Sequence, residues 1–273
     1  MSSDQGKQEN PEAEATGIVR QFLDARRRGQ ALPAFPGSIP ADLEAAYQLQ
    51  DQAIAQWGDA VVGWKVGFIA PERRDQSGDE RLLGPIFSRK LWNATGAIVD
   101  IPVFAGGFGA VEAEYVLRLD ADAPADKLHW SPEEAAQLPS TLHIGVEVAS
   151  SPLATINQLG PIVVVSDFGN NNGLVLGGEI ANWTALDEAG LVAETRIEGE
   201  VVGTGGACRL PGGLRGAFAF ALARSARRGR PLKKGDLIAT GNATGIHDIA
   251  IGQQAMIEFV GHGGISCRAV AAG

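Results

Sequence analysis

Cysteine, histidine and long apolar runs are scarce in this chain, and each scarcity excludes a class of protein. The two cysteines, Cys208 and Cys267, form no C-x-x-C pair, so neither a disulfide framework nor a zinc site is indicated. The four histidines form no H-x-x-x-H metal pair. No apolar run approaches the roughly 20 residues that cross a bilayer. The first thirty residues are polar and contain no apolar segment of a secretory signal. We therefore expect a cytoplasmic protein without a membrane partner.

Positive charge is also in short supply, with 23 basic against 32 acidic residues and a net charge of −9. A nucleic-acid partner is therefore not expected, because binding phosphates requires a basic face. The basic cluster at residues 224–230 is typical of a helix end, where cations complement the helix dipole. No Gly-x-Ser-x-Gly elbow appears, and the glycines at 106–109 precede a strand-like run rather than a helix, so a phosphate loop is not indicated.

The order of helical and strand-like segments predicts an α+β protein. Helices are expected at 11–28, from a cap at Ser38 to Gly58, after Ser131, and at 214–228. Between them, short β-type runs recur at 61–69, 111–119, 142–149, 162–165, 174–176, 191–197, 236–240 and 255–260. Strands this frequent are not a βαβ repeat and indicate a mixed, mainly antiparallel β core with peripheral helices. We predict an N-terminal helical segment at 1–58, with about ten disordered residues first, and a catalytic domain at 59–273.

Three glutamates stand in apolar, strand-like runs. Glu112 and Glu114 are separated by one alanine, and Glu147 lies in a second run. Side chains alternate along a strand, so Glu112 and Glu114 point the same way. Buried like charges are costly unless a cation lies between them, and converging carboxylates suit Mg²⁺ or Mn²⁺. On spacing alone, a solvated strand face that carries unrelated acids is an equal alternative.

Lys65 and Asp167 are candidates for chemistry. Lys65 lies in the apolar run 63–67, where it either extends to solvent or faces a site with counter-charges. Asp167 follows the run 162–166 and leads into an Asn/Gly turn. It is either part of that turn or a member of a polar cluster that orients a ligand.

The polar turn at 240–248 is the other candidate, with Thr240, Asn242 and His247 expected to bind substrate. His143 shares strand parity with Glu147, but a hydrogen-bonded core histidine is the favoured interpretation.

Several short motifs occur in order from about residue 40 to the end of the sequence. They are Gly63-Trp64-Lys65-Val66-Gly67, Gly78-Asp79, Gly84-Pro85-Ile86-Phe87, Val111-Glu112-Ala113-Glu114, Val146-Glu147-Val148, Ser166-Asp167, the run 173–178 and the run 235–241. Their order and spacing resemble the 2-keto-4-pentenoate hydratases and the 4-oxalocrotonate decarboxylases of the fumarylacetoacetate hydrolase superfamily.

This resemblance implies a β-roll core, a homo-oligomer and a bound Mg²⁺ or Mn²⁺. The matching metal ligands are Glu112, Glu114 and Glu147. Lys65 and Asp79 match the family's lysine and acid, and together with Asp167 they are the expected catalytic residues. The implied substrates are 2-hydroxy-2,4-dienoates or 2-oxo-enoates from aromatic-compound breakdown.

Three positions depart from the family pattern. Leu82 replaces a second acid, Ala110 replaces an arginine, and 211–213 replaces a His-Pro pair. The leading prediction is a hydratase that forms a 4-hydroxy-2-oxo acid, and the alternative is a decarboxylase of a 2-oxo-enedioate. Two weaker alternatives are a C–C-bond hydrolase and a non-catalytic partner of a pathway aldolase or decarboxylase.

Overall fold

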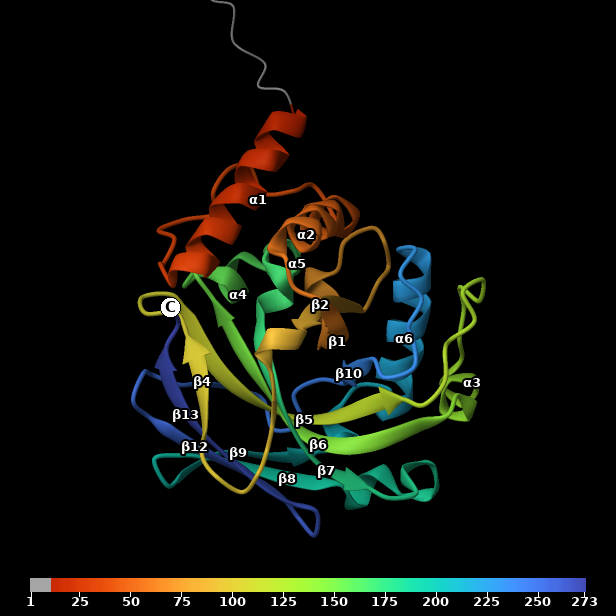
Figure 1. Ribbon diagram of the computed structural model, residues 1–273. Coiled ribbons are helices and arrows are strands. Elements are labelled where there is room, and N and C mark those ends of the chain that lie inside the picture. Colours follow the sequence, from red (N-terminus) through yellow and green to blue (C-terminus); the bar gives the residue numbers. More distant parts are fainter. Residues whose placement is uncertain (1–10) are drawn as a thin grey trace, which may run out of the picture.

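The computed structural model describes residues 11–273, in which two β-sheets are flanked by helices that lie above the sheets and to their right in Figure 1. The predicted disorder of residues 1–10 lies outside the described residues. The helices are α1 (Pro11–Arg28), α2 (Leu43–Trp57), α3 (Pro132–Gln137), α4 (Ile156–Leu159), α5 (Pro161–Ser166) and α6 (Gly213–Arg227). None of the helices in this range is long and apolar enough to cross a bilayer.

Thirteen strands form the two sheets in the described residues. Their bounds are β1 (Val61–Phe68), β2 (Arg81–Phe87), β3 (Leu91–Asn93), β4 (Val99–Val103), β5 (Phe108–Leu119), β6 (Ser140–Ser151), β7 (Asn171–Ile180), β8 (Val192–Ile197), β9 (Glu200–Gly206), β10 (Leu237–Ala239), β11 (Ile246–Asp248), β12 (Gln254–Phe259) and β13 (Gly263–Ala271).

The sheets are mixed but mainly antiparallel. The larger sheet has the order β2-β1-β10-β5-β6-β7-β3, with β11 paired to β5, and the smaller has the order β4-β13-β12-β8-β9. The pairs β1–β10, β3–β7 and β4–β13 are parallel. The predicted α+β class with a mixed, mainly antiparallel core is confirmed. The more specific β-roll description stays a prediction.

The first two helices pack on the same hydrophobic core as the sheets. Ile18, Phe22 and Leu23 of α1 are buried in that core together with Leu43 and Tyr47 of α2. Gly58 ends α2 in the left-handed conformation, as its sequence position predicts. The predicted cap at Ser38 is wrong, because α2 begins after Asp42, whose side chain accepts a hydrogen bond from the Ala45 amide. The division of the chain at residue 58 stays a prediction.

The run at 162–165 is helical rather than a strand, which corrects the prediction. Pro161 occupies the first turn of α5, where its missing N–H costs nothing. Val163 and Val165 are buried, and α5 packs against α2. A four-residue apolar run carries no periodicity that separates a buried helix from a buried strand. Asp167 therefore follows a short helix and begins the turn η3 (Phe168–Asn170) that leads into β7.

Candidate metal centre and adjoining pocket

The three glutamates meet on one face of the β5–β6 pair. Glu112 lies directly opposite Glu147 in the antiparallel register, and Glu114 lies opposite Gly145. Partners in such a pair share a face of the sheet, and so do residues two apart on one strand. One carboxylate oxygen from each glutamate therefore lies within 4.8 Å of the other two, and all three residues are buried. This arrangement excludes the solvated strand face.

Burial and neighbouring negative charge raise the pKa of Glu112 and of Glu114. Burial, reinforced by the charge of Glu147 and opposed by Lys65, raises the pKa of Glu112 to about 7. Burial and the charges of Glu147 and Glu112 also raise the pKa of Glu114 well above its ordinary value. A buried carboxyl resists ionisation when like charges are close and positive charge is insufficient. The cluster therefore favours a bound positive charge.

Lys65 extends from β1 into this cluster. Its Nζ lies 3.3 Å from Oε1 of Glu147, and its side chain is almost fully buried. Burial acts to lower the pKa of Lys65, but the charges of Glu147, Glu112 and Glu114 outweigh it and the pKa is raised. Lys65 is therefore an ammonium at neutral pH, a hydrogen-bond donor rather than a base.

Neighbouring backbone and amide groups orient the carboxylates. The Gly241 amide donates to Oε2 of Glu114 at 2.7 Å. Asn171 Nδ2 donates to Oε1 of Glu147 at 3.0 Å, and the Asn242 side chain is hydrogen-bonded to Glu112. Each glutamate thus has one oxygen held by the protein, which fixes the direction of the other.

The remaining oxygens fit a divalent cation. Glu112 Oε1, Glu114 Oε1 and Glu147 Oε2 are buried and have no hydrogen-bond partner among the described residues. Unpartnered buried carboxylate oxygens are costly, and hard oxygen donors are the ligands that Mg²⁺ and Mn²⁺ prefer. Three carboxylates and one ammonium leave two negative charges, which a divalent cation would neutralise.

A pocket of about 220 Å³ opens onto this cluster through Lys65, Glu112 and Asn242. Much of its wall is apolar and comes from the following side chains: Phe68, Ile69, Leu82, Pro161, Val164 and Ile246. Leu82, at the position of the family's second acid, is therefore part of the pocket wall. Such a pocket suits a carbon chain whose polar end reaches the glutamates.

Three further polar residues of the pocket, Arg73, Asn157 and Asn170, were not predicted from the sequence. Both Nη atoms of Arg73 donate to main-chain carbonyls, those of Asn157 and Gln158, at 2.9 Å each. Asn170 is buried with φ +66, and its Oδ1 has no hydrogen-bond partner in the described part of the chain. Asn170 therefore lines the pocket and has a buried acceptor without a partner among the described residues. Its position in an Asn/Gly turn was visible in the sequence, but the direction of its side chain was not.

The structure does not bring Asp79 or Asp167 to this pocket. Asp79 forms ion pairs with Arg224 and Arg227 of α6, at 3.5 and 3.4 Å. Asp167 is buried between Arg26, at 2.5 Å, and the Ser151 hydroxyl, at 2.6 Å. Both oxygens of Asp167 are already occupied, so it orients the turn that supplies Asn170 and Asn171. Catalytic roles for these two acids are left without geometric support.

Of the three residues expected to bind substrate, only Asn242 lines the pocket. The Thr240 hydroxyl donates to the main-chain carbonyl of Tyr115 at 2.7 Å. His247 lies opposite Val111 in the β5–β11 register, so it faces away from Glu112, and Ile246 takes the pocket side instead. His143 is a core residue, with Nδ1 3.2 Å from the carbonyl oxygen of Gly177.

Known proteins resemble this chain in sequence and in fold, although no protein-family model matches it. The chain is 26% identical over 266 residues to 2-keto-4-pentenoate hydratase 2 of Dechloromonas aromatica (strain RCB), covering 94% of this chain and 96% of that protein. It is also 26% identical over 229 residues to 2-keto-4-pentenoate hydratase of Burkholderia vietnamiensis (strain G4 / LMG 22486), covering 82% and 85%.

The fold matches 4-oxalocrotonate decarboxylase from Pseudomonas putida G7, solved with calcium and acetate. The TM-score is 0.77 at 21% identity, and the match covers 96% of this chain and 99% of that one. The same enzyme has been solved with magnesium and adipate, with the same TM-score. Together these relatives confirm the resemblance to the hydratase and decarboxylase family that the ordered motifs predicted.

Proposed function

We propose that this protein is a divalent-metal-dependent lyase that hydrates a 2-hydroxy-2,4-dienoate with an apolar tail. The observation that carries the proposal is the cluster of Glu112, Glu114, Glu147 and Lys65 at the end of a pocket whose outer wall is apolar. The names of the two relatives, both hydratases, support the same reaction class.

We assign a role to each residue of the site from its charge and its position. The three glutamates would hold Mg²⁺ or Mn²⁺, which when bound supplies a Lewis acid for negative charge that develops on substrate oxygens. Lys65, held as an ammonium beside Glu147, would donate a charge-assisted hydrogen bond to the substrate's carboxylate end. Asn170 and Asn242 would position water, because both are amides that line the pocket beside the glutamates.

Decarboxylation of a 2-oxo-enedioate is the second candidate, and two observations favour it. Leu82 removes the carboxyl group that could activate water in the hydratases, and the fold matches a decarboxylase with a TM-score of 0.77. Against it, a dioate substrate needs a cation for its second carboxylate. Arg73 is the pocket's one guanidinium in the described residues, and both its Nη atoms are occupied by main-chain carbonyls.

A direct comparison of two substrates tests the proposal. The purified protein is offered 2-hydroxypenta-2,4-dienoate and, separately, 2-oxohex-3-enedioate, each with Mg²⁺, while dienol absorbance and CO₂ release are followed. Hydration predicts loss of the dienol without CO₂ from the first substrate. CO₂ from the second substrate, with the first left unchanged, would replace the hydratase assignment by the decarboxylase. Inactivity on both would leave the non-catalytic alternative.

We also propose that the protein forms a homo-oligomer, as the family resemblance implies. We propose a cytoplasmic location on the basis of the composition. Size-exclusion chromatography with light scattering tests the first, and fractionation of the source cells tests the second.

A further inference from the structure

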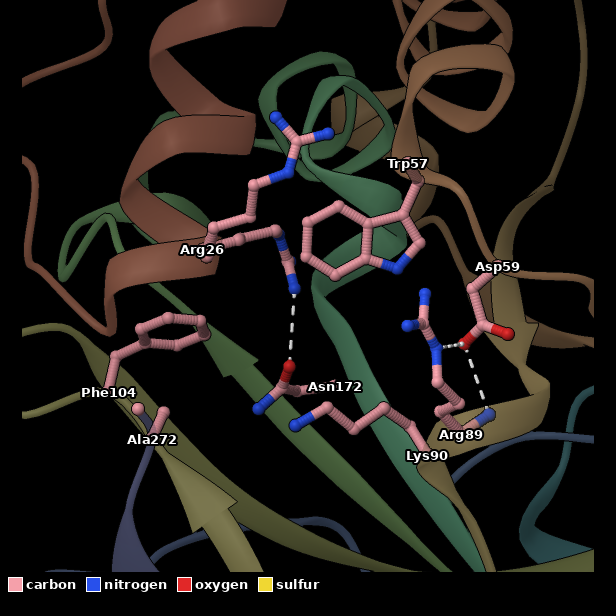
Figure 2. Close-up of a pocket in the computed structure, with 10 residues that line it drawn as sticks. Arg26, Trp57, Asp59, Arg89, Lys90, Phe104, Asn172 and Ala272 are labelled. Atoms are coloured by element: carbon pink, nitrogen blue, oxygen red, sulfur yellow. Dashed lines mark hydrogen bonds and ion pairs between the residues drawn. The ribbon is translucent and has the colours of Figure 1, made fainter.

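A second pocket, of about 430 Å³, is separate from the metal centre and shares no lining residue with it in the described chain. It lies between α1, the end of α2, the turn η2 (Ser88–Lys90) and the start of β7 (Figure 2). Four cationic side chains line it, with one carboxylate, two aromatic rings and an amide: Arg26, Arg27, Arg89, Lys90, Asp59, Trp57, Phe104 and Asn172. This basic lining belongs to a chain whose net charge is −9.

The three arginines already have partners. Arg26 has every donor occupied: Nε donates to Asp167 Oδ1 at 2.5 Å, and the two Nη atoms donate to Asn172 Oδ1 and to the main-chain carbonyls of Ser150, Asp167 and Asn171. Arg89 donates to the Gly58 carbonyl at 2.7 Å, and Arg27 donates to the Gln56 carbonyl at 2.7 Å. These bonds fix three guanidinium groups around the pocket without filling it.

Lys90 is different. Its side chain is half-buried, and its ammonium makes no hydrogen bond or ion pair within the described residues. Figure 2 shows Lys90 reaching across the pocket toward Asn172, below Arg26. Burial and the nearby charges of Arg26 and Arg89 lower the pKa of Lys90, which indicates that positive charge here lacks compensation.

The pocket's own acid cannot supply that compensation. Asp59 Oδ1 accepts hydrogen bonds from the Ala60 amide and the Ser88 hydroxyl, at 2.9 and 2.6 Å. Its Oδ2 accepts from the Arg89 amide at 3.1 Å and lies 3.3 Å from Arg89 Nε. Both oxygens of Asp59 are thus occupied by groups of η2 and its neighbours. Gly273 also lines the pocket, but it forms no ion pair with these cations in the described structure.

We propose that this pocket binds a small organic anion with two negative charges, a phosphate ester or a dicarboxylate. Lys90 is its main charged contact and Arg89, whose Nη1 makes no hydrogen bond or ion pair in the described structure, is its second, and Trp57 and Phe104 pack against its carbon skeleton. Ammonium and guanidinium groups recognise such oxyanions through charge-assisted hydrogen bonds. Because the pocket is separate from the metal centre, anion binding in it does not depend on the proposed hydration reaction.

Titration calorimetry tests the proposal with methyl phosphate and succinate as probes and acetate as the singly charged comparison. The protein is kept free of divalent metal at pH 8 and constant ionic strength, so that the three glutamates repel anions. The Lys90→Met variant removes the charge, and Lys234→Met, at an exposed lysine elsewhere, is the matched control. Both variants are expected to keep the wild-type thermal midpoint, because the Lys90 ammonium has no bond to lose.

We expect saturable one-site binding of at least one dianion, and at least about tenfold weaker binding of acetate. Lys90→Met should weaken dianion binding by about tenfold or more, the worth of one charge-assisted hydrogen bond, and Lys234→Met should not. The probe that binds more tightly distinguishes phosphate esters from dicarboxylates. No saturable binding, equal affinity for acetate, or wild-type affinity in Lys90→Met would overturn the proposal.

Discussion

Lys65 is the only lysine of the described chain whose ammonium is surrounded by several buried carboxylates. A buried ammonium is costly, and here three glutamates offset that cost. The same three glutamates remain in excess of the single positive charge, so the lysine does not replace a metal. It occupies one side of the cluster and leaves the other oxygens of the glutamates without partners.

Replacing Lys65 by methionine should separate metal binding from turnover. Lys65→Met keeps the length of the side chain and removes its charge, so Mn²⁺ affinity should be unchanged or higher, because the cluster becomes more negative. Turnover should fall by about 10²-fold or more, because the substrate loses the hydrogen bond that orients its carboxylate. Calorimetry and steady-state kinetics measure the two effects. A variant with wild-type kcat would remove Lys65 from the mechanism.

Asn170 offers a test of the hydration step. Asn170→Gly removes the free Oδ1 while keeping a residue that tolerates φ +66. Loss of one hydrogen bond to water should lower kcat for hydration by about tenfold. Asn93→Ala, at an exposed position at the end of β3, is the control. If Asn170→Gly hydrates the dienoate at the wild-type rate, another group positions the water.

At the scale of the elements, the strand pattern predicted the face of the glutamates but not their pairing. Alternation along 111–119 placed Glu112 and Glu114 on one side, and the structure agrees. The register that sets Glu147 opposite Glu112 could not be derived, because a slip of one residue would turn every side chain of β6 to the other face. The grouping of Glu147 with Glu112 and Glu114 at one metal was implied by the family resemblance and not by the alternation along either strand.

The errors of prediction share a cause, which is long-range packing. Asp167 was assigned to the end of a strand, but the segment before it is the helix α5 and its carboxylate binds Arg26, 141 residues away. His247 was expected to bind substrate, and it pairs with Val111 rather than with Glu112, because β11 pairs with β5 in a register that the sequence does not specify. Local propensity cannot report such partners.

The contact between β2 and η3 positions the turn that supplies Asn170 and Asn171. A methyl group on Gly84 would overlap the carbonyl oxygen of Phe168, and Gly169 faces Gly84 in turn with φ +65. Gly84→Ala should therefore lower the free energy of unfolding by about 1–3 kcal/mol, the usual cost of overpacking a rigid contact, and should weaken metal binding through Asn171.

Urea denaturation with an unchanged m value would measure this loss of stability. Gly178→Ala, in β7 with open space around it, is the matched control and should stay close to the wild-type midpoint. Equal stability of the two variants would show that β2 and η3 can separate freely.

For the whole molecule, the metal centre links cation binding to pH. In the metal-free protein the pKa of Glu112 is about 7, so below that pH a proton occupies a group that the cation needs. Mg²⁺ affinity should therefore rise as pH increases through about 7, by up to about tenfold per pH unit below it for one displaced proton. Calorimetry in two buffers of different ionisation enthalpy would detect the released proton. An affinity that is the same at pH 5.5 and pH 8 would contradict this linkage.

The central claim, that three glutamates from β5 and β6 hold one divalent cation, is tested most directly by counting Mn²⁺ bound per chain by electron paramagnetic resonance. We predict one Mn²⁺ per wild-type chain and an affinity at least about a hundredfold weaker in Glu114→Gln, which keeps the shape of the side chain. Glu258→Gln, at an exposed position of β12, should bind as the wild type does. Wild-type stoichiometry and affinity in Glu114→Gln, or no bound Mn²⁺ in the wild type, would contradict the account.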